Sequence, residues 1–175
     1  MSAPLRLDAV EGLWRVGLKG RRAADWLAAR GVPVPAAPNR WLAYGDGACL
    51  RLGLGEYFVE GGAAVRVLAD ELRYESGVYP ALRQDGAWRL AGPEVGALLE
   101  QICALDLCAR AAREPDAVVL TSVLGVAAQL IWRGDAAARV FHLWCDASYA
   151  AYVGEALHEI VSELGGQSHK AGGKG

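Results

Sequence analysis

The chain has 175 residues, of which 53% are apolar and 22% are charged, so it can bury a core and is too apolar for a disordered protein. Its formal net charge of −2 at pH 7, with arginines spread along the chain, gives no reason to expect nucleic acid as a partner. The longest apolar run, 117–132, contains polar residues and is shorter than the ~20 residues of a membrane span, so no membrane partner is expected.

The cysteine and histidine positions argue against disulfides and metal sites. No CxxC or HExxH spacing occurs, and the first residues lack the basic-then-apolar order of a secretory signal. We therefore predict reduced thiols, a cytoplasmic protein and no metal-ligating residue. The residues concerned are Cys49, Cys103, Cys108 and Cys145, with His142, His158 and His169.

The first part of the chain is predicted to run strand, helix, three strands and helix. Glycines end most of these elements, and three prolines within 33–38 make the segment after the first helix extended and irregular. An arm or edge strand is expected over 1–11. The predicted strands are 13–18, 41–44, 49–54 and 56–60, and the predicted helices are 21–31 and 63–72.

Residues 85–107 predict a strand that turns at a glycine directly into a helix. Trp88 and Leu90 alternate with smaller or polar residues, as in a half-buried strand, and Gly92 supplies the turn. Pro93 suits the first helical turn, and Glu94 places a negative charge at the positive end of the helix dipole. An apolar stripe then follows at helical spacing, formed by Val95, Leu98, Leu99, Ile102 and Leu105.

The remainder of the chain repeats this order of elements. A polar loop is expected over 108–116, strands over 118–124, 127–132 and 139–144, and an amphipathic helix over 148–164. Residues 165–175, rich in glycine, are expected to form a disordered tail.

Aligning Gly20 with Gly92 superposes the two parts of the chain as a weak internal repeat. Each part reads strand, helix, two or three strands, and helix. The predicted halves are about 13–73 and 85–164, with a hinge over 74–84. The fold class that follows is α+β, with two similar halves built from mainly antiparallel sheets and with helices packed on one side.

No segment has the pattern of a catalytic or cofactor site, and none is predicted. Gly53-Leu54-Gly55 lacks the third glycine of a dinucleotide loop and precedes a strand, so a tight turn is favoured. Gly92-Pro93 could present backbone N–H groups to an anion, but ordinary helix capping is favoured because Glu94 would repel the ligand. Cys103 and Cys108 are interpreted as buried structural thiols.

Aromatic residues divide into a predicted core group and a predicted contact group. Trp41, beside Arg40, and Tyr57 lie where loops meet strands, and aromatic and arginine residues there commonly anchor interfaces. Arg40, Trp41 and Tyr57 are therefore the candidate partner-contact residues, with partly exposed core residues as the alternative. Residues expected to pack in the core are Trp14, Trp26, Trp88 and Trp132.

Five motifs, taken in order, resemble the gamma subunit of heterotetrameric sarcosine oxidase and of related N-methyl amino acid dehydrogenases. That subunit is itself similar to the folate-binding domain of the glycine-cleavage aminomethyltransferase. The motifs span about residues 13–160 and are LKGRRAADWLAARGVPVPAAPNR (18–40), LRLGLGEYFVEG (50–61), LAGPEVGALLEQICALDL (90–107), TSVLGVAAQLIWR (121–133) and FHLWCDASYAAYVGEAL (141–157).

This resemblance implies one aminomethyltransferase-like α+β domain over 1–164 and a noncatalytic subunit that stabilises assembly. It places flavin, NAD and tetrahydrofolate on partner subunits of the alpha, beta and delta types. The chain is much shorter than a full aminomethyltransferase. A stand-alone tetrahydrofolate-binding domain in one-carbon metabolism is the alternative, and a free-standing homodimeric domain with a regulatory role is a third hypothesis.

Overall fold

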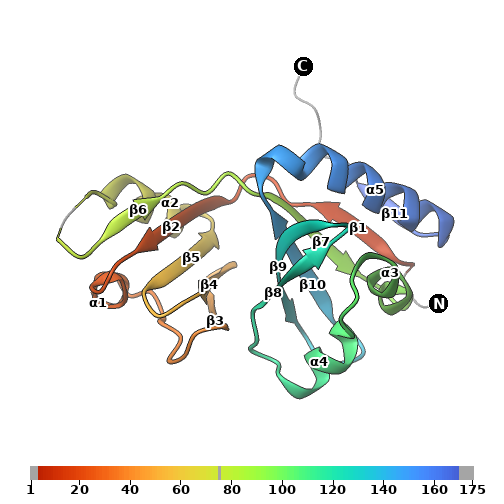
Figure 1. Ribbon diagram of the computed structural model, residues 1–175, viewed down its shortest axis with the longest axis horizontal. Coiled ribbons are helices and arrows are strands. Elements are labelled where there is room, and N and C mark those ends of the chain that lie inside the picture. The colour runs from red at the N-terminus through yellow and green to blue at the C-terminus, as the bar shows by residue number, and fades with distance from the viewer. Residues whose placement is uncertain (1–3, 75, 170–175) are drawn as a thin grey trace. The chain divides into compact units, whose positions relative to one another are not determined.

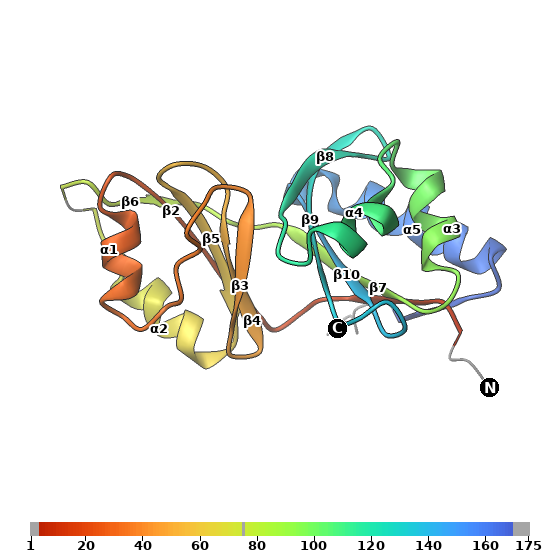
Figure 2. The same ribbon diagram turned by 90° about the horizontal axis from the view of Figure 1, so that it is seen from below.

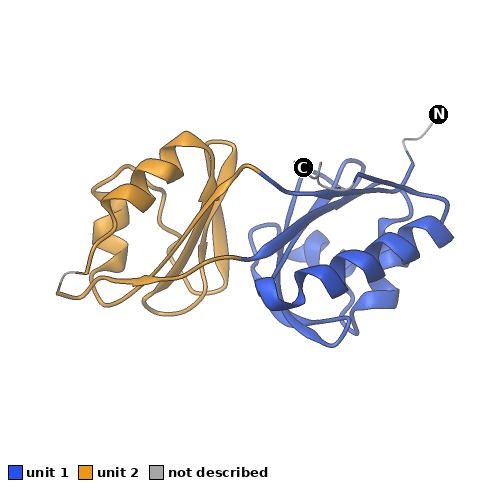
Figure 3. Cartoon of the chain, turned by 90° about the horizontal axis from the view of Figure 1, so that it is seen from above, with its two compact units in different colours: residues 1–11, 85–175 blue, residues 12–84 orange. Residues whose placement is uncertain are grey.

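The computed structural model describes residues 4–74 and 76–169, and the chain separates into two compact units. Unit 1 comprises residues 1–11 and 85–175, and unit 2 comprises residues 12–84 (Figure 3). Each unit contains one sheet with helices on one face, so the fold is mixed α+β with mostly antiparallel strands, as the sequence predicts.

Unit 2 contains a five-stranded antiparallel sheet in the order β3-β4-β5-β2-β6. Helices α1 and α2 lie on the same side of this sheet (Figure 2). Leu27 of α1 shares one apolar core with the strand residues Leu18 and Val59. The elements are β2 Trp14–Lys19, α1 Ala23–Ala28, β3 Arg40–Tyr44, β4 Gly47–Arg51, β5 Glu56–Gly61, α2 Ala63–Glu71 and β6 Tyr79–Ala81.

Unit 1 contains a six-stranded sheet in the order β11-β1-β7-β10-β9-β8, in which only the β1–β11 pairing is parallel among the described strands. Its helices contribute Leu98, Leu107 and Leu157 to a single core cluster. The elements are β1 Arg6–Ala9, β7 Gly86–Ala91, α3 Val95–Ile102, α4 Leu107–Arg113, β8 Val119–Val123, β9 Val126–Arg133, β10 Val140–Cys145, a 3₁₀ turn Ala147–Tyr149, α5 Ala150–Glu163 and β11 Gln167–His169.

The internal repeat is visible in the strand orders of the two sheets. From the outer hairpin inwards, the strands run β3-β4-β5-β2 in unit 2 and β8-β9-β10-β7 in unit 1. In each unit the last of these strands, β2 or β7, is followed in the chain by the first helix of the unit. The next position in each sheet is filled by an exchanged strand. β1 precedes β2 in the chain but pairs with β7, whereas β6 precedes β7 but pairs with β2 (Figure 1).

The two aligned glycines explain how the exchanged strands approach. Gly20 and Gly92 follow β2 and β7, and their φ angles are +129° and +114°, values that L side chains rarely adopt. A Cβ at Gly20 would collide with the carbonyl of Gly77, just before β6. A Cβ at Gly92 would lie 2.6 Å from the carbonyl oxygen of Pro4, just before β1. Glycine is therefore required at both turns because another chain segment passes directly over them.

Two predictions in the C-terminal part are corrected. The segment expected to be a loop contains helix α4, because the Asp106 side chain caps it by accepting from the Ala109 N–H at 2.8 Å and the following residues favour helix. Residues 167–169, expected within a disordered tail, form strand β11 against β1, while 170–175 lie outside the described residues.

Two apolar residues are not in the core as predicted. Helix α3 ends at Ile102, so Leu105 does not extend its buried stripe and is 42% exposed. Trp14 is 44% exposed and lies under the guanidinium of Arg66, 5.4 Å from the ring centroid. Trp26, Trp88 and Trp132 are buried as expected.

Candidate functional site

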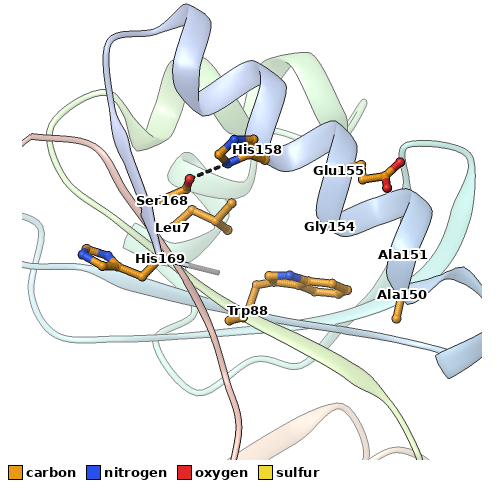
Figure 4. A pocket seen from close by; sticks show the side chains of 10 residues that line it. Leu7, Trp88, Ala150, Ala151, Gly154, Glu155, His158, Ser168 and His169 are labelled. Atoms are coloured by element: carbon orange, nitrogen blue, oxygen red, sulfur yellow. Dashed lines mark hydrogen bonds between the residues drawn. The ribbon is translucent and has the colours of Figure 1, made fainter. Parts of the chain in front are cut away.

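A pocket of about 280 Å³ lies within unit 1, between helix α5 and the adjoining strands β1 and β11 (Figure 4). Its floor is the Trp88 indole from β7. Its walls are largely apolar and include Leu7 and Ala9 from β1 and Ala150 and Gly154 from α5. The polar side chains at its margin are those of Glu155, His158, Ser168 and His169.

The Trp88 indole lies beneath α5 because Gly154 lacks a side chain. A Cβ placed on Gly154 would lie 3.5 Å from Cζ2 and 3.6 Å from Nε1 of the indole, so the helix backbone passes close over the ring. At the neighbouring ring atom Cη2, a Cβ on Gly86 would lie only 2.7 Å away. These two glycines fix the indole in the pocket floor, where the residue is only 7% exposed.

Two side-chain contacts hold strand β11 beside this pocket, a hydrogen bond and a histidine–carboxylate pair. Ser168 Oγ and His158 Nδ1 form one pair (Figure 4), which joins β11 to α5. His169 Nδ1 lies 3.2 Å from Asp8 Oδ1, which joins β11 to β1, and Asp8 also pairs with Arg6 at 2.7 Å. In the described part of the chain no carboxylate bonds to His158, so the serine and histidine do not form a catalytic triad.

A second cavity, of about 670 Å³, lies at the start of α3 in unit 1. Its lining includes Gly92, Pro93 and Cys108, which were separate candidates in the sequence, together with Arg139. The Val95 N–H donates to the Gly92 carbonyl at 3.2 Å, the local capping that the sequence favours. Burial and then Asp106 raise the pKa of Cys108 more than Arg139 lowers it, so its thiol stays protonated at neutral pH.

The thiols of Cys49 and Cys145 are also held in the protonated form. Burial raises the pKa of Cys49 to about 12 and, together with Asp85 and Asp146, raises the pKa of Cys145 to about 11. Cys103 is buried with the core of unit 1. This environment is that of structural cysteines.

His142 lies on the face of the unit 1 sheet opposite the helices. Burial, then Arg133 and Arg89, lower its pKa to about 3, so the imidazole is neutral at physiological pH. Arg89 is its direct partner across the β7–β10 register, and the ring stacks on Trp144 with centroids 5.9 Å apart. No group of three or more His, Cys, Asp or Glu within 4–74 and 76–169 is arranged to hold a metal ion.

The structure separates the three predicted partner-contact residues. Arg40 and Trp41 are consecutive on the edge strand β3, so their side chains leave opposite faces of the sheet. Tyr57 is 1% exposed and belongs to the core of unit 2, with the guanidinium of Arg51 5.6 Å from its ring. A surface role is therefore left to Arg40 and Trp41, and it remains a prediction.

The sequence reasoning did not select the residues of the α5 pocket. Ser168 and His169 fell in the expected tail, and Trp88 was interpreted only as a core residue. One signal was available, because Ala150, Gly154 and His158 recur every four residues beside the apolar stripe of α5. The two small residues of this row, Ala150 and Gly154, permit close approach of another group beside the buried stripe.

The fold is similar to that of an aminomethyltransferase. A solved structure with this fold is the glycine cleavage system aminomethyltransferase T from Bartonella henselae, with a TM-score of 0.57 and 13% sequence identity. The match covers 89% of this chain but only 45% of that protein. No protein-family description and no curated protein sequence matches the chain. None of the described helices combines the length and apolar character needed to cross a membrane.

Proposed function

We propose that this chain is a noncatalytic, gamma-type subunit of a heterotetrameric sarcosine oxidase-like complex that oxidises N-methyl amino acids. The observation that carries the proposal is an aminomethyltransferase-like fold that covers nearly the whole chain but under half of the matched enzyme. The ordered sequence motifs over 13–160 favour the gamma-type subunit among proteins with this fold. Partners of the alpha, beta and delta types would carry flavin, NAD and tetrahydrofolate, in the cytoplasm.

Strand β3 is the surface that we propose for the partner contact. It is an edge strand of the unit 2 sheet, with Arg40, Trp41 and the exposed Leu42 along it. An edge strand offers backbone N–H and C=O groups on one side to another chain. Arginine and tryptophan are residue types enriched at the energetic centres of interfaces.

Co-expression with candidate flavoprotein subunits, followed by size-exclusion chromatography, tests the proposal. We expect the chain to elute with the flavoprotein, and omission of the chain to lower the yield of the assembled complex. Arg40→Glu should weaken co-elution, whereas the same charge reversal at the exposed Arg21, outside β3, should not. Elution of the chain as a separate monomer with every candidate would contradict the proposal.

A stand-alone tetrahydrofolate-binding domain is the second candidate, because the matched structure is an aminomethyltransferase and the sequence motifs resemble a subunit similar to the folate-binding domain of that enzyme. This support rests on likeness of fold alone. Calorimetric titration of the isolated chain with tetrahydrofolate separates the two functions. Saturable heat at micromolar ligand would favour the binding domain, and no heat at high micromolar ligand would exclude it.

A further inference from the structure

The indole N–H of Trp88 is a hydrogen-bond donor without a partner in the α5 pocket. Among residues 4–74 and 76–169, no acceptor bonds to Nε1, although the residue is more than nine-tenths buried. The nitrogen is not sealed inside the core. Trp88 lines the pocket, and Nε1 is not fully enclosed by protein atoms. This donor can bond to water in the pocket, and a ligand that displaces the water must supply an acceptor in its place.

The charges around the pocket restrict what that ligand can be. Among residues 4–74 and 76–169 no lysine or arginine lines it, and Glu155 places a carboxylate at its margin, which disfavours an anion. A cation is disfavoured by the N–H donor in the floor. The histidines are already engaged, His158 by Ser168 and His169 by Asp8. The arginine-lined cavity beside α3 shows by contrast what an anion site in this unit would contain.

The size and walls of the pocket restrict the ligand further. A volume of about 280 Å³ lies just below the roughly 300–1,000 Å³ typical of ligand pockets, so a single small ring system fits better than a dinucleotide. The surfaces of Leu7, Ala9 and Ala150 suit an apolar ring. The indole presents an edge rather than a free face there, because α5 covers the ring at Gly154.

We propose that the α5 pocket binds a small uncharged molecule with an apolar ring and a carbonyl oxygen, of the aryl amide or lactam class, which accepts a hydrogen bond from Trp88 Nε1. The site lies wholly within unit 1 and does not depend on the proposed assembly role. Ligand binding and subunit assembly can therefore succeed or fail separately.

Benzamide is the probe that tests this proposal, with benzoate and benzylamine as anionic and cationic matches of the same ring. In ¹⁵N-labelled full-length chain, the Trp88 indole signal is the one that disappears in Trp88→Phe. We expect benzamide to shift this signal downfield in a saturable way, and the two charged probes to bind at least about tenfold more weakly. No shift with benzamide, or equal responses to all three probes, would overturn the proposal.

Gly154→Ala provides a test that does not depend on a destabilised protein. The added methyl would lie 3.5–3.8 Å from the indole, in ordinary contact, and would cover Nε1 without strain. Loss of this hydrogen bond and of pocket volume should weaken benzamide binding about tenfold. Ser162→Ala, on an exposed position of α5 outside the pocket, should leave binding unchanged. Unchanged affinity in Gly154→Ala would also overturn the proposal.

Discussion

Gly154→Ala should make the protein more stable, although the residue touches a buried tryptophan. Glycine in the interior of a helix is less favourable than alanine by about 0.5–1 kcal/mol. Gly154 lies in the middle of α5 and has no positive φ angle, so alanine fits its backbone. The new methyl would meet Trp88 at 3.5 Å or more, where contact is attractive. The expected gain is about 1 kcal/mol, or roughly 2–4 °C in Tm for a chain of this size.

Urea unfolding and scanning calorimetry of the two proteins measure this gain. Gly86→Ala is the matched control, because it also adds one methyl against the same indole, but at 2.7 Å from the ring and from the Ala150 side chain. That variant should lose stability by about 1–3 kcal/mol through overpacking. A loss of 1 kcal/mol or more in Gly154→Ala would show that the Trp88 ring does not lie under α5 as described, and the pocket would lose its floor.

Three further predictions follow from other parts of the fold. Gly92→Ala should lower the free energy of unfolding, measured in urea, by about 2–4 kcal/mol, because alanine there would combine a φ of +114° with a Cβ 2.6 Å from the Pro4 carbonyl oxygen. A decrease of less than about 1 kcal/mol would contradict the close passage of Pro4 over Gly92. His142 has a pKa of about 3 when folded against 6.5 unfolded, so it contributes stability that is complete above pH 6.5 and is lost as the pH falls towards 3. His142→Gln should reduce the fall in unfolding free energy between pH 6.5 and pH 3 by up to about a few kcal/mol. An unchanged dependence of the unfolding free energy on pH would count against burial of the neutral ring. The isolated segment 85–164 should not give a cooperative thermal transition, because it lacks β1 and β11, whereas a circular permutant that appends 1–11 after residue 169 through a flexible linker should.

Local patterns in the sequence predicted many strands and helices of unit 1 and unit 2, because each pattern depends only on residues within one short segment. The alternation at Trp88 and Leu90, the turn at Gly92 and the stripe of α3 each depend on residues fewer than ten apart. The α4 helix was also readable, since Asp106 is a good N-cap before LCARAAR, but the nearby proline favoured a loop. The Asp106 cap determines the local structure here, and the proline only marks where the helix has already ended.

The exchange of β1 and β6 could not be predicted in the same way. Pairing of β1 with β7 joins residues about eighty positions apart, and the four-residue strand RLDA has no feature that selects β7 over β2. What selects the pairing is tertiary packing, with Leu5 and Leu7 in the core of unit 1. The aligned glycines were visible as a repeat, but their function, which is to admit the exchanged strand, depends on that pairing.

The exchange also links the α5 pocket to the integrity of unit 1. β1 supplies the apolar wall at Leu7 and pairs with β11, which supplies Ser168, so the pocket exists only while both strands are docked. A ligand that binds this state and not the undocked one stabilises it by RT ln(1 + [L]/Kd). Amide hydrogen exchange in β1 and β11 should therefore slow on ligand binding more than exchange in β8, at the far edge of the same sheet and without residues in the pocket. Equal slowing in all three strands would place the ligand elsewhere in the unit.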